Sequence, residues 1–100
     1  MKNIKKKKLE IFIESTYERN LLKIFKKNDV LTYACLPTEH YHSKQVSSIE
    51  DDIIDVFEFS MCIVIVNIDQ YKKIVDEVGK VLSRANGIMY CQDIEEIEND

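Results

Sequence analysis

The sequence predicts an α+β fold in which two helices cover one face of a four-stranded antiparallel sheet. Strand and helix patterns follow one another in the order strand, helix, strand, strand, helix, strand. A chain of 100 residues, 45% hydrophobic and 32% charged, has the balance of a single globular domain, residues 1–100. Right-handed crossovers then place the first and third strands centrally, which is the βαββαβ order of a ferredoxin-like sandwich.

The first strand and the first helix are predicted from periodicity. Every second residue of 8–14 is apolar, which is typical of a strand with one buried face. Ser15 and Glu18 then have the spacing of a capping box, so a helix is expected to begin at Ser15 and to end near Asn28.

The middle of the chain contains two strand patterns and a polar segment between them. Residues 31–36 form the second strand, which is expected to end at Pro37 because proline cannot donate to a strand ladder. Residues 37–52 are predicted to be a long exposed loop, and such loops in compact domains are usually functional. The third strand is predicted over residues 56–66.

The second helix and the last strand follow, and both chain ends are highly charged. Asp69 is the expected helix cap, Gly79 is expected to allow close packing against a neighbour, and residues 88–94 form the last strand. Lysines crowd residues 2–8 and acidic residues crowd 93–100. The ends, residues 1–7 and 96–100, are therefore expected to be frayed.

The third strand predicts self-association. Its segment 61–66 is apolar on both faces, whereas the two helices cover only one face of the sheet. Phe12, on the outward side of the first strand, would extend the uncovered apolar patch. We therefore expect several copies of the chain to pack through this face.

Charge, hydropathy and cysteine usage exclude several classes of protein. The net charge of −4 argues against nucleic-acid binding, and no apolar run is long enough to embed the chain in a membrane. Cys35, Cys62 and Cys91 form an odd set without a CxxC pair, so reduced, mostly buried thiols and a cytoplasmic location are expected.

The chain resembles the P-II superfamily of trimeric signalling proteins over most of its length. The resemblance is in KKLEIFIES as the opening strand, YERNLLKIFKKNDV as the first helix, the polar loop 37–52, and FEFSMCIVIVNIDQYKKIVDEVGKVL as strand plus helix. It implies a homotrimeric regulatory protein whose long loop acts on a partner protein, such as a membrane transporter or an efflux system. CutA-like metal-binding proteins share the architecture, and residues 34–37 resemble their second strand.

The resemblance also implies where a ligand would bind. P-II proteins that bind adenine nucleotides have a Gly-rich segment after the second helix, but here only SRANG (residues 83–87) remains. One glycine cannot form the same phosphate cradle, which argues against ATP binding. The candidate ligand-binding residues are Arg84, Asn86 and Gly87 of this segment, with Lys44 and Gln45 of the long loop.

A second candidate site is a metal site on the long loop. His40 and His42 are two residues apart, so in an extended segment both imidazoles project to the same side. Cys35 could add a thiolate, and this ligand set suits Cu or Zn. Ordinary solvated loop histidines are the alternative. No catalytic constellation can be assembled from the sequence, so a binding protein is expected rather than an enzyme.

Overall fold

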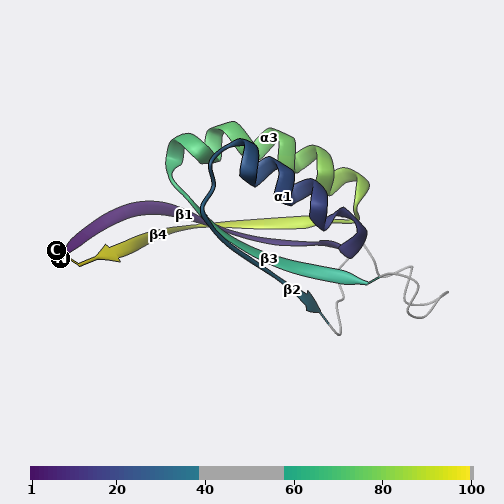
Figure 1. The fold of residues 1–100 in the computed structure, drawn as a ribbon, viewed down its shortest axis with the longest axis horizontal. Coiled ribbons are helices and arrows are strands. Elements are labelled where there is room, and N and C mark those ends of the chain that lie inside the picture. Colours follow the sequence, from purple (N-terminus) through teal and green to yellow (C-terminus); the bar gives the residue numbers. More distant parts are fainter. Residues whose placement is uncertain (39–57, 100) are drawn as a thin grey trace.

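The computed structural model describes residues 1–38 and 58–99, and it has the predicted α+β architecture. The elements are β1 (Lys2–Glu14), a 3-10 turn (Ser15–Tyr17), α1 (Glu18–Lys27), β2 (Thr32–Thr38), β3 (Phe59–Val66), α3 (Ile68–Arg84) and β4 (Ile88–Glu98). The sheet has the order β2-β3-β1-β4 and every neighbouring pair is antiparallel, so β1 and β3 are central as predicted. Both helices lie on one face of the sheet, which is the ferredoxin-like arrangement (Figure 1).

The core lies between the helices and the inner face of the sheet. Alternate residues of β1 and β3 point into it, and each helix contributes one apolar stripe. Its largest fully buried side chains are Leu9, Ile11, Ile13, Leu21, Phe25, Cys62, Val64, Val66, Ile74 and Val78. The alternation predicted for β1 and the stripes predicted for the two helices are therefore confirmed.

The helix caps differ from the prediction. The Ser15 hydroxyl lies 3.0 Å from the Ser60 hydroxyl, and α1 begins only at Glu18 without a side-chain cap. At α3 the N-cap is Asn67, two residues before the predicted Asp69. The Asn67 carboxamide accepts the Gln70 amide at 2.7 Å, while the Gln70 side chain accepts the Asn67 amide at 3.0 Å. The Ser15 prediction was wrong because its hydroxyl lies beside that of Ser60, a residue 45 positions away. The Asp69 prediction was wrong because Asn67 and Gln70 already have the spacing of a capping box two residues earlier.

The chain ends are paired strands in this structure and not the frayed tips that were expected. Residues 2–7 of β1 pair with residues 93–98 of β4, from Lys2 opposite Glu98 to Lys7 opposite Asp93. The basic start of the chain therefore lies beside its acidic end, and cross-strand pairs of opposite charge are favourable. These two segments, which we call the arm, extend beyond the helices (Figure 1).

Pro37 does not end β2, which continues to Thr38. Pro37 lies opposite Ser60, and β2 is an edge strand, where a proline whose missing N–H would face outward is tolerated. The β3 strand begins at Phe59, and Glu58 before it is not part of the strand. Residues 56 and 57 of the predicted strand, like residues 39–52 of the predicted loop, lie outside the described residues.

Gly79 is not a close-packing site. It is exposed on α3, and a Cβ atom built on it would meet nothing within 4 Å. The close contact is instead at Gly87, after the helix. A Cβ there would lie 2.6 Å from Leu82 Cδ2 and 2.7 Å from Ile13 Cγ2.

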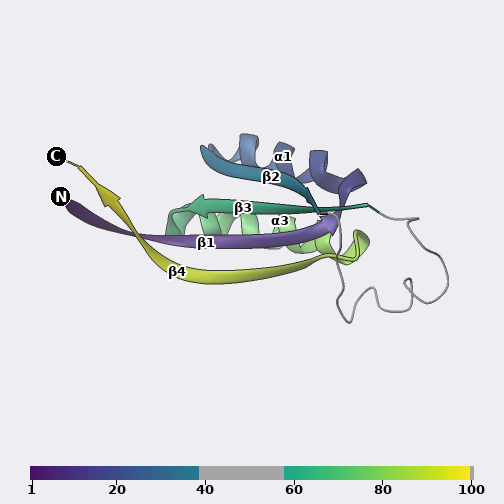
Figure 2. The same ribbon diagram turned by 90° about the horizontal axis from the view of Figure 1, so that it is seen from below.

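The outer face of the sheet, opposite the helices, carries an apolar patch. Directly paired residues share a face, so the register assigns its members. We call this set the outer patch: Phe12, Ala34, Leu36, Met61, Ile63, Ile65, Ile88 and Tyr90. The predicted position of Phe12 on this outward face is confirmed. Phe12 pairs with Met61, and its ring packs edge-on against Tyr90 at 6.5 Å between centroids. Figure 2, which views the sheet from below, shows α1 and α3 on the far side of the sheet from this face. No helix of the described segments is long and apolar enough to cross a membrane.

Candidate functional site

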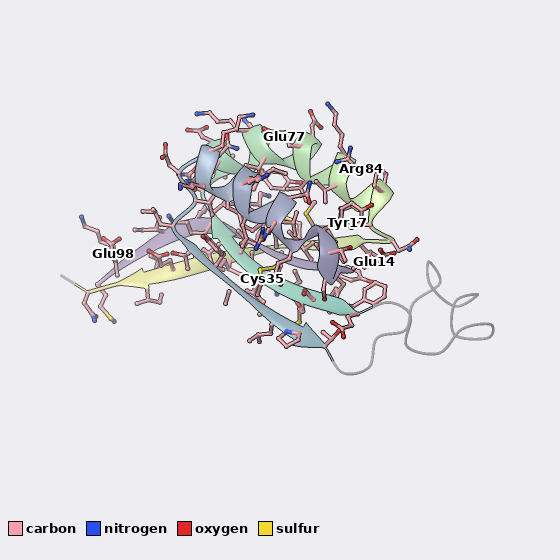
Figure 3. The ribbon with its side chains drawn as sticks, turned by 45° about the vertical axis from the view of Figure 1, so that its right-hand side comes forward. Glu14, Tyr17, Cys35, Glu77, Arg84 and Glu98 are labelled. Atoms are coloured by element: carbon pink, nitrogen blue, oxygen red, sulfur yellow. A yellow bond between two sulfur atoms is a disulfide. The ribbon has the colours of Figure 1, made fainter. Side chains whose placement is uncertain are left out.

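The turn between α3 and β4 holds three of the predicted ligand-binding residues. Arg84 ends α3 and is exposed, whereas Asn86 has a left-handed backbone with φ of 50°. The Asn86 carboxamide donates to the carboxylate of Glu14, a residue only 9% exposed at the end of β1. Figure 3 shows Glu14 and Arg84 at the same end of the molecule. Asn86 therefore anchors the turn to β1, through the hydrogen bond between its side chain and Glu14.

Gly87 brings the turn close to β1. Its amide donates to the Leu82 carbonyl at 3.0 Å, and the Glu14 amide donates to the Ala85 carbonyl at 3.1 Å. Together with the close approach to Ile13, these bonds close the turn against the first strand. A phosphate cradle needs several free backbone N–H groups that point outward, and Gly87 does not supply one.

The other predicted ligand residues cannot be placed together with this turn. Lys44, Gln45, His40 and His42 lie outside the described residues. Cys35, the third member of the predicted metal set, is on β2 and packs against the core on the inner face of the sheet. The prediction that it forms a metal site with the two histidines stays a prediction.

Two of the three cysteines form a disulfide, which differs from the expected buried thiols. Cys35 and Cys62 are directly opposite on β2 and β3, with their Cα atoms 4.1 Å apart, and their sulfur atoms are bonded. Cys91 is the free cysteine and is exposed on β4. Sequence spacing alone could not reveal the pair, because 27 residues separate the two cysteines and only the strand register brings them together.

A carboxylate completes this cluster. Glu18 is the first residue of α1, and its carboxylate oxygen and the two sulfur atoms all lie within 4.8 Å of one another. Cys62 is fully buried, while Cys35 and Glu18 are partly exposed. Figure 3 shows Cys35 on β2 beneath α1. This is the grouping of potential metal ligands that the described residues bring together, and sequence analysis missed two of its members.

A charged cluster marks the base of the arm. Lys7 Nζ donates to Asp93 at 2.7 Å and lies 5.5 Å from the centre of the Tyr71 ring. The hydrogen bond to Asp93 raises the pKa of Lys7 above its ordinary value of 10.5. The same bond lowers the pKa of Asp93 below 3.8. A groove of about 440 Å³ runs beside the pair, between the arm and the start of α3.

Solved structures with the same fold are P-II-like proteins. CPII from Thiomonas intermedia K12, bound to ADP, AMP and acetate, superposes with a TM-score of 0.79 and 15% identity over 98% of this chain and 94% of that one. A PII-like signaling protein from Thermus thermophilus superposes at 0.72 with 18% identity, covering 97% and 94%. B. subtilis GlnK in its ATP complex superposes at 0.63 with 14% identity, covering 90% and 83%.

The comparisons by sequence add no relatives. No family model matches the chain, and no curated protein matches it. The solved structures share the α+β fold that the sequence predicted for this chain.

Proposed function

We propose that this chain is a P-II-like regulatory protein that senses a small ligand and passes the signal to a partner protein. The observation that carries the proposal is the match of fold over nearly the whole of CPII, which is described as a nitrogen regulatory PII-like protein. We propose a binding role and not catalysis, which this likeness in fold supports. The cytoplasm is the location that suits such a role.

The second part of the proposal concerns how the signal is passed. Residues 39–57 connect β2 to β3, and in this proposal they change conformation when the ligand binds and thereby change their contact with the partner. A membrane transporter or an efflux system is the kind of partner that the resemblance implies.

The third part concerns the ligand. CPII is described with ADP and AMP, and GlnK with ATP. In this chain Asn86 is engaged by Glu14, and Gly87 is packed against Leu82 and Ile13. We therefore propose that adenine nucleotides bind weakly here, and that the effector is a smaller ligand or an ion.

The proposed function is tested by equilibrium dialysis against ATP, ADP, AMP and bicarbonate, followed by hydrogen exchange with each compound. A ligand that binds and changes the exchange of residues 39–57 supports the sensing role. Binding without any change in that segment would contradict the proposed signalling route. Micromolar ATP affinity would contradict the proposed preference against nucleotides.

A further inference from the structure

The cluster of Cys35, Cys62 and Glu18 is built from three elements. The strand register places the two cysteines opposite each other, and the first turn of α1 places a carboxylate above them. With Cα atoms 4.1 Å apart, rotation about the Cα–Cβ bonds alone changes the separation of the sulfur atoms. Two thiolates bound to one tetrahedral Zn²⁺ at about 2.3 Å each are roughly 3.8 Å apart, which this backbone spacing accommodates.

We propose that the reduced protein binds a thiophilic divalent cation, of the Zn²⁺ or Cd²⁺ type, through Cys35 Sγ, Cys62 Sγ and the Glu18 carboxylate. Two thiolates and one carboxylate form a donor set that such ions favour, and water completes a tetrahedral site. Cys62 is fully buried, so the ion enters from the side of Cys35, which is partly exposed on the edge strand β2.

The charge of the cluster supports a cation as its ligand. Two thiolates and a carboxylate this close together, one of the thiolates being buried, would repel one another. A divalent cation between them offsets most of their combined negative charge. Because cysteine binds a metal ion as its thiolate, the affinity should rise with pH.

The disulfide and the metal site are alternative states of the same two sulfur atoms. Oxidation by a low-molecular-weight disulfide forms the Cys35–Cys62 bond, reduces the oxidant to two thiols, and transfers both cysteine protons to them. Only the dithiol state can then bind the ion. The inference does not depend on the proposed regulatory function, because it rests on side chains of the described segments alone.

The test uses the full chain, reduced and freed of metal under anaerobic conditions, and titrated with Cd²⁺. Thiolate-to-cadmium charge-transfer absorption reports sulfur ligation, and a competing chelator gives the affinity. We expect one ion per chain, an affinity that rises with pH, and no sulfur-ligated ion after oxidation to the disulfide.

Substitutions identify the ligands. Cys35→Ser should abolish the absorption band, and Glu18→Gln should weaken binding by at least about tenfold, since even groups outside the ligand shell can matter by 10–100-fold. Matched controls are Cys91→Ser, an exposed cysteine on β4, and Asp76→Asn, an exposed carboxylate on α3. Both controls should bind Cd²⁺ like the wild type.

Several outcomes would overturn the proposal. One is equal binding by the oxidised protein. Another is a band that survives Cys35→Ser but is lost in Cys91→Ser, or in the double variant His40→Ala and His42→Ala. Glu18→Gln leaves both sulfur atoms in place, so it still decides the role of the carboxylate if Cys35→Ser fails to fold.

Discussion

Single side chains stabilise the start of α3 and the turn that follows it. Asn67 caps α3, Asn86 ties the following turn to Glu14, and Gly87 allows that turn to approach Ile13. Each residue is typical of a turn or a cap, so the sequence marks these places. The contacts that Asn86 and Gly87 make with Glu14 and Ile13 join distant parts of the chain, so the sequence did not predict them. The partner of Asn67 is Gln70, only three residues away, and this local capping motif was readable from the sequence.

Replacing Asn67 with alanine should lower the free energy of unfolding by about 1 kcal/mol, because the α3 capping box loses one of its two hydrogen bonds. Urea denaturation measures this loss. The matched variant is Asp69→Ala, which removes only a favourable charge near the helix start and should cost less, about 0.3–1 kcal/mol. A larger loss for Asp69 than for Asn67 would contradict the assigned cap.

The two glycines should respond to alanine in opposite ways. Gly79→Ala should stabilise the protein by about 0.5–1 kcal/mol, because the site is an exposed helix interior with open space around it. Gly87→Ala should destabilise it by about 1–3 kcal/mol, because the new methyl group would overlap Leu82, Ile13 and the Phe12 carbonyl oxygen. Thermal melts of the two variants and the wild type measure these effects. Melting temperatures that shift equally in both variants would refute the predicted difference.

At the scale of elements, the sequence predicted strands and helices well wherever apolar residues repeat with a clear period. It failed at the arm, because residues 2–7 of β1 alternate poorly and resemble a solvated lysine run. What makes this segment a strand is the acidic segment 93–98 beside it. That complementarity is a contact between distant parts of the chain, and local periodicity does not encode it.

The Lys7–Asp93 bond should stabilise the arm only over a defined range of pH. The pKa of Asp93 is lowered on folding, so its contribution is present above 3.8 and is lost as the pH falls through the folded value. The pKa of Lys7 is raised, so its contribution is present below 10.5 and is lost as the pH rises through the folded value. Amide exchange in the arm of Asp93→Asn should therefore exceed that of the wild type between these limits and match it outside them.

The matched control for this bond is Asp76→Asn on α3, which should leave exchange in the arm unchanged. A difference between Asp93→Asn and the wild type that persists in strong acid would show that the carboxylate acts by packing and not by charge.

At the scale of the whole molecule, α1 and α3 cover only one face of the sheet, and no other helix of the described segments covers the outer face. The outer patch contains Leu36, 53% exposed, and Tyr90, 57% exposed, around the partly buried centre of β3. An exposed apolar face of this kind is typical of an interface. The doubly apolar third strand of the sequence predicted an apolar outer face. The sequence did not predict that Ile88 and Tyr90 of β4 also lie on this face, because their position depends on the strand register.

We expect Met61→Lys to break the proposed trimer into monomers, because it places a charge in the outer patch between Phe12 and Leu36, its neighbours on β1 and β2. Light scattering gives the mass, and circular dichroism checks that the fold is kept. The matched control is Ile68→Lys at the start of α3, an isoleucine that is 44% exposed and lies outside the patch. A wild-type protein that is monomeric at micromolar concentration would disprove the assembly.

The pairing within the arm brings the two ends of the chain together, so the order of the elements along the chain could be changed. Because Lys2 lies opposite Glu98, the two ends are neighbours at the tip of the arm (Figure 1). A short Gly-Ser linker could therefore close the chain into a ring, which could be reopened at the exposed turn residue Asp29, where φ is 56°. Such a circular permutant should fold with the same sheet, and it would begin with β2 and finish with α1.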